Sequence, residues 1–167
     1  MTNAHAFDDL LAANRNFSDT FSLSGFDGVA RAGVCMVTCM DSRIDPLGMI
    51  GLVPGDAKIL RNPGGRVTDP VLIALVIGVH MLKVKRILIV EHTRCAMASS
   101  SEAEVRHALS ERSGVDAAWM SIGMITDQSA TLRDDVGKVR AHPLIPETVE
   151  VGGFLYDVDT GLMRQLV

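Results

Sequence analysis

The sequence predicts an α/β fold with a mainly parallel central sheet flanked by helices. Three short runs rich in small and β-branched apolar residues are typical of buried strands: "AGVCMVTC" (32–39), "AKILRN" (57–62) and "KRILIVEH" (85–92). Helical patterns follow the second and third runs, at residues 70–82 and 99–112. Buried strands that alternate with helices indicate a parallel sheet covered by those helices.

The helix predicted over residues 70–82 is the most apolar element of the chain. Pro70 suits the first helical position, and Thr68 or Asp69 can cap the helix before it. Because the segment is apolar on nearly all sides, we expect it to be buried, either inside the domain or against a second subunit. Its histidine, His80, is expected to be a hydrogen-bonded residue of that core or interface. The segment is too short to cross a bilayer, which needs about 20 residues.

Four other segments complete the predicted fold. Residues 6–16 form a short N-terminal helix, and residues 45–56 form a broken helix and turn. A further helix is predicted over residues 127–142. The tail, residues 149–167, alternates and turns at "DTG", which is typical of a strand or hairpin.

Length and composition predict one domain that spans residues 1–167. With 47% hydrophobic and 22% charged residues, the chain has the composition of an ordinary globular protein. The net charge of −4 offers no basic footprint, so we expect no nucleic-acid partner. The N-terminus is acidic and polar where a signal peptide needs an apolar core, and no apolar segment is long enough to span a membrane. We therefore expect a cytoplasmic protein without a membrane partner.

The three cysteines are an odd number in a chain without an export signal. This argues against a disulfide framework and for metal binding, catalysis or burial. Cys35 and Cys39 are four residues apart on one predicted strand, so they lie roughly 13 Å apart at about 3.3 Å per residue. Two sulfurs on one zinc ion are at most about 4.6 Å apart. Cys35 is therefore expected to be a small buried hydrophobic residue.

Cys39, His92 and Cys95 are the candidate zinc ligands. Cys39 ends the first predicted strand, and "EHTRC" follows the third. Sites in parallel α/β sheets gather at the carboxyl ends of the strands, and neighbouring strands are about 4.8 Å apart. His92 and Cys95, three residues apart, can point the same way. Two thiolates and one imidazole suit Zn²⁺ and leave a fourth position for water, as in catalytic zinc sites.

Asp41 and Arg43 closely follow Cys39 and are the candidate catalytic pair. Zinc lowers the pKa of bound water, so a carboxylate that accepts the water's proton in a hydrogen bond would orient the nucleophile. Arg43 would keep Asp41 ionised and aimed. Asp41 has a second option, which is to bind zinc itself as a fourth ligand and close that position. The sequence leaves both states open.

The motifs "CMDSR", "RNPGG" and "EHTRCAM", in this order and spacing, resemble those of the β-class carbonic anhydrases. The resemblance is strongest over residues 34–97, and the modest length is similar to the shorter branch of the family, in archaea and actinobacteria. By this resemblance the three candidate ligands take the zinc places, and Asp41 and Arg43 take the catalytic ones. Gly64 and Gly65 of "RNPGG" would then lie in the loop that lines the active-site cleft and binds substrate.

The resemblance also implies a reaction and an assembly. Family enzymes are carbonate dehydratases, zinc lyases that hydrate carbon dioxide reversibly to bicarbonate and a proton, with zinc-bound hydroxide as the nucleophile. They work as homodimers or higher homo-oligomers, and an N-terminal helical arm packs on the partner subunit. Residues 1–30 would be that arm, and contact with a partner would explain the apolar helix over residues 70–82.

Two rival functions share the same ligand set. Relatives with these ligands are hydrolases of a carbon dioxide analogue, carbonyl sulfide or carbon disulfide. Arg94 and Ala96 stand where the family usually has an acidic or small polar residue and a glycine, and this altered rim could favour such a substrate. Arg94 adds a positive charge that either attracts bicarbonate or faces solvent. The other rival is a zinc-stabilised binding protein without catalytic activity.

Overall fold

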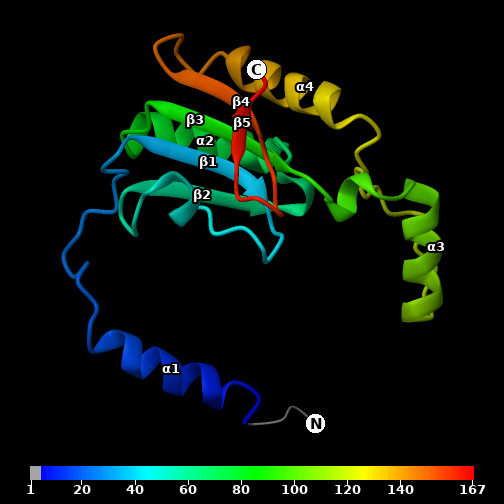
Figure 1. Cartoon of the computed structure of the whole chain (residues 1–167), viewed down its shortest axis with the longest axis horizontal. Coiled ribbons are helices and arrows are strands. Elements are labelled where there is room, and N and C mark those ends of the chain that lie inside the picture. Colours follow the sequence, from blue (N-terminus) through cyan, green and yellow to red (C-terminus); the bar gives the residue numbers. More distant parts are fainter. Residues whose placement is uncertain (1–4) are drawn as a thin grey trace.

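The computed structural model describes residues 5–167 and has the predicted α/β architecture (Figure 1). Its strands are β1 (Val34–Cys39), β2 (Ala57–Asn62), β3 (Arg86–His92), β4 (Glu150–Tyr156) and β5 (Met163–Gln165). Its helices are α1 (Asp8–Ser18), α2 (Asp69–Met81), α3 (Glu102–Ser113) and α4 (Gln128–Arg140). Three short 3-10 turns are η1 (Gly48–Ile50), η2 (Pro63–Gly65) and η3 (Ala96–Ala98).

The sheet is mainly parallel, as predicted. Its strand order is β2-β1-β3-β4-β5. Strand β1 pairs in parallel with β2 and β3, and β3 pairs in parallel with β4. The tail forms the predicted hairpin, in which β5 runs antiparallel to β4. Because β1 and β3 are parallel neighbours, Cys39 and His92, their last residues, lie at the same edge of the sheet.

The observed elements lie close to their predicted boundaries. The strand predicted over residues 57–62 is β2, with the same bounds. The segment 45–56 contains the single turn η1, which ends at Gly51 in the left-handed conformation. Helix α3 begins three residues later than predicted because Ser101 caps it. The Ser101 hydroxyl accepts from the Glu104 amide at 3.2 Å, and the Glu104 carboxylate accepts from the Ser101 amide at 2.7 Å.

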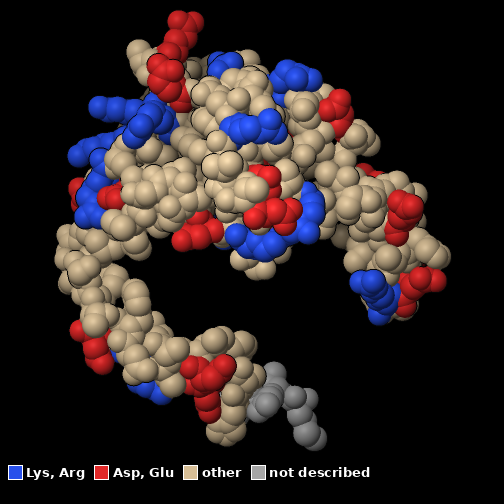
Figure 2. Space-filling model, in the orientation of Figure 1, with Lys and Arg blue, Asp and Glu red and all other residues tan. Residues whose placement is uncertain are grey.

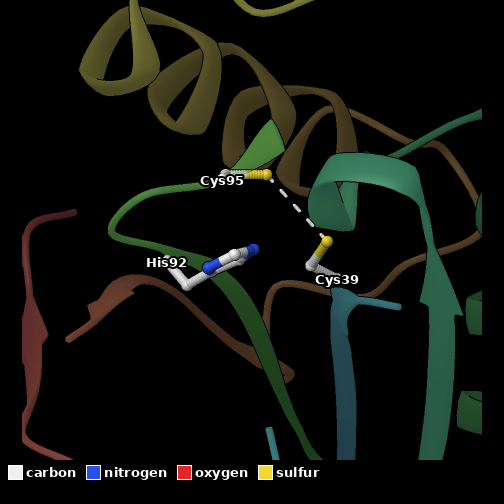
Figure 3. Close-up of side chains that lie close together, drawn as sticks. All are labelled: Cys39, His92 and Cys95. Atoms are coloured by element: carbon white, nitrogen blue, oxygen red, sulfur yellow. Dashed lines mark hydrogen bonds between the residues drawn. The ribbon is translucent and has the colours of Figure 1, made fainter. Parts of the chain in front are cut away.

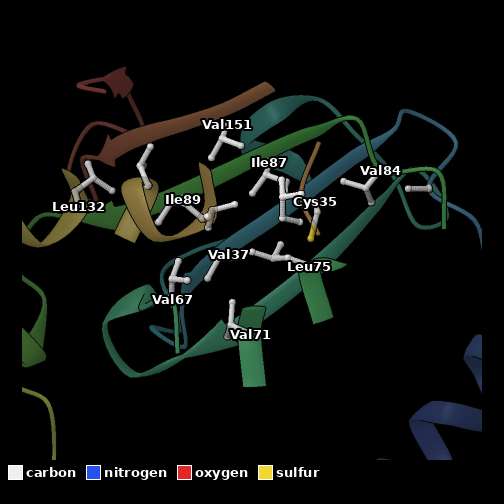
Figure 4. Packing of buried hydrophobic residues seen from close by; sticks show 14 residues of the cluster. Cys35, Val37, Val67, Val71, Leu75, Val84, Ile87, Ile89, Leu132 and Val151 are labelled. Atoms are coloured by element: carbon white, nitrogen blue, oxygen red, sulfur yellow. The ribbon is translucent and has the colours of Figure 1, made fainter. Parts of the chain in front are cut away.

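The hydrophobic core lies between the sheet and helices α2 and α4 (Figure 4). One buried cluster joins side chains of β1 and β3 to side chains of both helices: Cys35, Val37, Ile87, Ile89, Val71, Leu75, Leu132, Val136 and Val139. Each aliphatic side chain of this kind stabilises the fold by about 1.5–3 kcal/mol when buried. Cys35 is 1% exposed, and burial raises the pKa of its thiol to about 12. Its predicted role as a small buried hydrophobic residue is confirmed.

Helix α2 buries one side within this chain. The buried residues on that side are Val71, Leu75 and Gly78. The other side exposes Ile73 at 62%, Ile77 at 45% and Met81 at 72%. The exposed His80 ring makes a hydrogen bond through Nε2 to the Leu144 carbonyl at 2.8 Å. Burial inside the domain therefore explains the apolar residues on one side of α2. Contact with a second subunit stays the prediction for the apolar residues on its exposed side.

Two helices project from the body of the molecule, α1 at one end and α3 at the other (Figure 1). Across its described length, α1 buries no residue, and Phe7, Leu10 and Leu11 are 67%, 62% and 54% exposed. Figure 2 shows open space between α1 and the body. Residues 1–4 of the predicted arm, 1–30, lie outside the described residues. Among residues 5–167, no helix has both the length and the apolar character needed to cross a membrane.

Candidate metal centre

Three side chains, two from neighbouring strands and one from the loop after β3, meet at the carboxyl edge of the sheet (Figure 3). Cys39 ends β1, His92 ends β3, and Cys95 directly precedes the turn η3. One potential ligand atom from each lies within 4.8 Å of the other two, and the two sulfurs are 4.0 Å apart. All three residues are buried, at 5%, 0% and 3% exposure. The structure thus brings together the three residues that the sequence singled out, and this group could hold a metal ion.

The His92 ring is oriented for a ligand bond through Nε2. Its Nδ1 lies 2.9 Å from the carbonyl oxygen of Thr93. Because a carbonyl only accepts, Nδ1 carries the proton and Nε2 keeps its lone pair. Burial lowers the pKa of His92, which favours this neutral form. Among residues 5–167, none makes a hydrogen bond to the buried Nε2 atom.

The Cys95 thiol needs a nearby positive charge to ionise in this environment. Burial raises the pKa of the Cys95 thiol to about 11, and the nearby Cys39 adds to the shift. The Gly64 amide donates a hydrogen bond to Cys39 Sγ at 3.4 Å, which favours sulfur as an acceptor. Two sulfurs and one imidazole nitrogen, all buried and mutually close, fit Zn²⁺. A zinc ion would be held by Cys39, His92 and Cys95.

The turn η2 supports this group from the side of β2. Pro63 lines the cleft in front of the sulfurs, while Gly64 and Gly65 are buried behind it. Gly65 has φ +69°, and a Cβ atom there would lie 2.9 Å from the Val90 carbonyl oxygen and 3.0 Å from the Cys39 amide. Only glycine allows this close approach. The predicted contact of the two glycines with substrate stays a prediction.

Asp41 and Arg43 form a bidentate ion pair beside the candidate ligands. Arg43 Nε donates to Asp41 Oδ1 at 2.9 Å, and Arg43 Nη2 donates to Asp41 Oδ2 at 2.7 Å. The Arg43 amide also donates to Asp41 Oδ1, at 3.0 Å. These hydrogen bonds hold the pKa of Asp41 well below its usual range, so the carboxylate is ionised. Asp41 Oδ2 lies 3.9 Å from His92 Nε2.

Arg61 fixes the backbone from which Cys39 and Asp41 project. Its guanidinium donates to the carbonyl oxygens of Cys39 at 2.9 Å, Asp41 at 2.6 Å and Ile44 at 3.3 Å. Sequence reasoning named the "RNPGG" loop but gave this arginine no role. Its place at the end of a strand, directly before the cleft loop, was the available signal.

A cleft of about 450 Å³ opens in front of the sulfurs. Asp41 and Arg43 form its polar wall. The remaining wall is mainly apolar and includes Met40, Pro63, Ala96 and Met97. A cleft of this size and character suits a small molecule of low polarity.

The two departures from the family motif have distinct surroundings. Arg94 faces solvent and pairs with Asp159, with Nη2 and Oδ1 2.6 Å apart. Two alternatives were predicted for Arg94, attraction of bicarbonate or exposure to solvent. Its side chain is exposed to solvent and has an acidic partner. Ala96 opens the turn η3 and is not among the residues with positive φ. Alanine is therefore unstrained there, and the glycine of the family motif is not required by this backbone.

A second charged group lies behind the sheet, where no sequence pattern indicates it. Asp135 of α4 is 0% exposed and accepts hydrogen bonds from Arg66 Nε at 2.7 Å, Lys138 Nζ at 2.7 Å and the Val67 amide at 2.9 Å. Burial alone would raise the pKa of Asp135, but these donors outweigh it and lower the pKa.

Glu91, the neighbour of His92, is buried close to this group. It is 0% exposed, and its two carboxyl oxygens accept no hydrogen bond from residues 5–167. Burial, reinforced by the charge of Asp135, raises the pKa of Glu91 to about 7. Gln128 donates its amide to the His92 carbonyl at 2.9 Å, which anchors the end of β3. Within a strand that is otherwise apolar, no local pattern marks Glu91 as part of a site.

Known proteins share this fold and are similar to this chain in sequence. The carbonic anhydrase family model matches residues 34–163. β-Carbonic anhydrase 1 of Mycobacterium tuberculosis is 29% identical over 163 residues, which cover 95% of this chain and 96% of that protein. A carbon disulfide hydrolase of Acidithiobacillus thiooxidans is 30% identical in an alignment of 165 positions, and the match covers 84% of this chain and 75% of that protein. The crystal structure of carbonic anhydrase from Streptococcus mutans has a TM-score of 0.88 and 36% identity, with both chains fully covered. On these grounds, the chain belongs to the β-carbonic anhydrase family.

Proposed function

We propose that the protein catalyses the zinc-dependent, reversible hydration of carbon dioxide to bicarbonate and a proton. The observation that carries this proposal is the buried group of Cys39, His92 and Cys95 beside an ionised Asp41, all at one small apolar cleft. The similarity to β-carbonic anhydrase 1 over nearly the whole chain supports it.

In this mechanism the protein's own residues hold the metal, orient the attacking water and keep Asp41 in place. Cys39, His92 and Cys95 would hold the zinc ion, which when bound would supply the Lewis acidity that makes water nucleophilic near neutral pH. Asp41 accepts a hydrogen bond from the attacking water and turns its lone pair toward the carbon of carbon dioxide. Arg43 keeps Asp41 ionised and binds both of its carboxylate oxygens, which would leave them less available as metal ligands. This orientation favours the state in which the fourth metal position is open.

A second candidate function is the hydrolysis of carbon disulfide or carbonyl sulfide. The carbon disulfide hydrolase of A. thiooxidans is as similar in sequence as the carbonic anhydrase, although it matches less of this chain. The apolar cleft wall, with Met40 and Met97, would accept a linear, polarisable molecule of either kind. Sequence identity near 30% does not choose between the two substrates, so the choice depends on turnover.

Paired assays on the zinc-loaded protein test both candidates. Stopped-flow measurement with a pH indicator reports carbon dioxide hydration, and sulfide release reports hydrolysis of carbon disulfide and carbonyl sulfide. We expect hydration to be the faster reaction. Sulfide release without hydration would replace the first candidate by the second. If the zinc-loaded protein shows neither reaction up to about pH 9, both enzymatic candidates are wrong and the protein is a non-catalytic, zinc-stabilised binding protein.

Zinc occupancy is tested by two cysteine variants. Cys95→Ser should lose most of the bound zinc, because a hydroxyl is a poor substitute for a thiolate ligand. Cys35→Ser is the matched control, since Cys35 lies in the core cluster and should leave the zinc content unchanged. Metal analysis after dialysis gives the ratio of zinc to protein. Full occupancy in Cys95→Ser would remove Cys95 from the ligand set.

We also propose that the protein assembles as a homodimer or a larger homo-oligomer. The exposed apolar side chains of α1 and of the outer side of α2 support this, because side chains such as Leu10 and Ile73 gain from burial against a second copy. Light scattering of the purified protein tests it. Leu10→Asp should weaken the assembly, and a monomeric wild type at micromolar concentration would contradict it. The cytoplasmic location expected from the sequence stays a prediction.

A further inference from the structure

The turn of the β4–β5 hairpin packs against the loop that joins His92, the last residue of β3, to Cys95. The Thr93 amide donates to the Tyr156 carbonyl at 2.9 Å, and the Thr93 hydroxyl accepts from the Val158 amide at 3.1 Å. This loop is therefore held from the outside by a hairpin that supplies none of the candidate ligands.

Arg94, the next residue of the loop, has an unusual backbone conformation. Its φ is +52°, and among residues 5–167 it shares a positive φ with one other residue that is not glycine, Lys83. Such a conformation is unfavourable for an arginine unless surrounding contacts maintain it. The side chain provides one such contact, because Arg94 Nη2 lies 2.6 Å from Asp159 Oδ1 at the tip of the hairpin.

The backbone of Arg94 contacts the candidate catalytic pair. Its carbonyl oxygen accepts from Arg43 Nη2 at 3.3 Å. The same Nη2 atom donates to Asp41 Oδ2 at 2.7 Å. The Arg94 carbonyl and the Asp41 carboxylate therefore hold one nitrogen of Arg43 between them. A shift of the Arg94 carbonyl would remove one of the two fixed points that orient the guanidinium.

We propose that Arg94 and Asp159 are positioning residues, which hold Arg43 in the orientation that binds Asp41. Arg94 and Asp159 touch neither the cleft wall nor the candidate metal ligands through their side chains. Their contact with Arg43 runs through the Arg94 carbonyl, and the charge of Asp159 also acts on Arg43 at longer range. Family members usually have an acidic or small polar residue in place of Arg94. The ion pair would then be this chain's own means of fixing the loop.

The Asp159 side chain can be removed without unfolding the turn. The turn is kept by backbone hydrogen bonds, since the Gly161 amide donates to the Asp157 carbonyl at 2.8 Å and the Asp157 amide donates to the Leu162 carbonyl at 2.8 Å. The Asp159 amide donates to Asp157 Oδ1 at 2.8 Å and does not involve the Asp159 carboxylate. Asp159→Ala therefore keeps the turn while it removes the ion pair, together with the Asp159 charge that acts on Arg43.

The test compares three variants of the zinc-loaded protein. Asp159→Ala should lower kcat for carbon dioxide hydration by roughly two- to fivefold, as expected for an exposed ion pair, without a change in KM or zinc content. Asp159→Glu should restore kcat, because it keeps the charge. Glu111→Ala is the matched control. It removes one carboxylate from another exposed side-chain contact, with His107 on the projecting helix α3, and should leave kcat unchanged.

A spectroscopic readout separates positioning from general stability. The Nε–H resonance of Arg43 should shift and exchange faster with water in Asp159→Ala, and should return to the wild-type position in Asp159→Glu. Arg94→Gly should leave this resonance closer to its wild-type position than Asp159→Ala does, because glycine adopts the positive φ without the side-chain contact. The double variant should be no worse than Asp159→Ala alone.

An unchanged Arg43 resonance in Asp159→Ala would overturn the proposal. So would a fall in kcat that Asp159→Glu fails to restore. The effect on kcat rests on the proposed function, whereas the Arg43 resonance does not. If the wild type hydrates no carbon dioxide, the proposed function fails, and the resonance alone still decides whether the ion pair positions Arg43.

Discussion

Two pairs of aspartate and arginine flank the candidate metal centre, and they differ in almost every respect but their chemistry. Asp41 and Arg43 are two residues apart in sequence and lie at the cleft, where the Asp41 side chain is 18% exposed. Asp135 and Arg66 are 69 residues apart and lie behind the sheet, where the Asp135 side chain is 0% exposed. In both pairs the guanidinium contacts both carboxylate oxygens.

The comparison shows that the degree of burial determines whether an aspartate–arginine pair contributes mainly to the site or to the stability of the fold. At the cleft, water screens the attraction, so the pair contributes little to stability and leaves an ionised carboxylate near the metal position. Behind the sheet, Asp135 also accepts hydrogen bonds from the Val67 amide and from Lys138. It therefore connects the segment that follows the "RNPGG" loop to helix α4. We infer that the first pair serves the reaction and the second maintains the fold around it.

The largest expected effect concerns the buried pair. Asp135→Asn should lower the free energy of unfolding by about 3–5 kcal/mol, because it leaves the Arg66 charge without its partner in a mostly buried place. Urea unfolding followed by circular dichroism measures this. The fraction that remains folded should retain kcat within about twofold. A stable variant with a strongly reduced kcat would reverse the roles assigned to the two pairs.

The cleft pair should show the opposite pattern. Asp41→Asn should lower kcat/KM for carbon dioxide hydration roughly 100-fold, which corresponds to about 2.7 kcal/mol, because an amide both fails to accept the same hydrogen bond and leaves Arg43 unpaired. The free energy of unfolding should change by less than about 1 kcal/mol. Zinc analysis is the control, and the metal content should equal that of the wild type. Wild-type turnover in this variant would contradict the role given to Asp41.

The buried pair can be examined further through its neighbour Glu91. The folded-state pKa of Glu91, about 7, lies above the ordinary value of 4.5, so the folded chain binds this proton more tightly than the unfolded chain. The resulting stabilisation is complete below about pH 4.5 and is lost as the pH rises to about 7. Glu91→Gln should remove this loss and make the protein more stable than wild type by about 2 kcal/mol at about pH 8.

That comparison belongs in the zinc-free protein, because a nearby metal charge would itself lower the pKa of Glu91. Urea unfolding between about pH 5 and pH 8 gives the two pH profiles. If wild type and Glu91→Gln have parallel profiles, the carboxyl group is not titrating in this range, and the nearby charge of Arg66 offsets its burial more strongly than expected.

The fold and the metal group were predictable because their signals are local. Apolar runs of four to eight residues identified β1, β2 and β3, and the parallel order then required the ends of β1 and β3 to meet. Cys39 and His92 occupy those ends. The two-residue spacing of Asp41 and Arg43 likewise indicated their pairing. Each of these predictions depended on short stretches of chain and one rule of sheet topology.

The remaining contacts join segments that are far apart in the sequence, and no short sequence pattern predicts them. Arg66 contacts Asp135 only because α4 packs across the sheet. Arg94 contacts Asp159 only because the β4–β5 hairpin returns to the loop after β3. The outward projection of α1 was expected from the family resemblance, not from its composition. Amphipathic spacing shows which side of a helix is apolar but not which molecule covers that side.

The smallest expected effects come from replacing each arginine by lysine, which keeps the charge and loses the two-pronged geometry. Arg43→Lys should lower kcat/KM by roughly tenfold, equivalent to about 1.4 kcal/mol, because a single ammonium group cannot hold both oxygens of Asp41. Arg66→Lys should instead lower the free energy of unfolding by about 1 kcal/mol and leave kcat unchanged, since Lys138 and the Val67 amide still bind Asp135. Stopped-flow kinetics and urea unfolding of both variants measure these effects. If both lysine variants lose activity equally, the cleft pair and the buried pair are coupled across the sheet and the division between them is wrong.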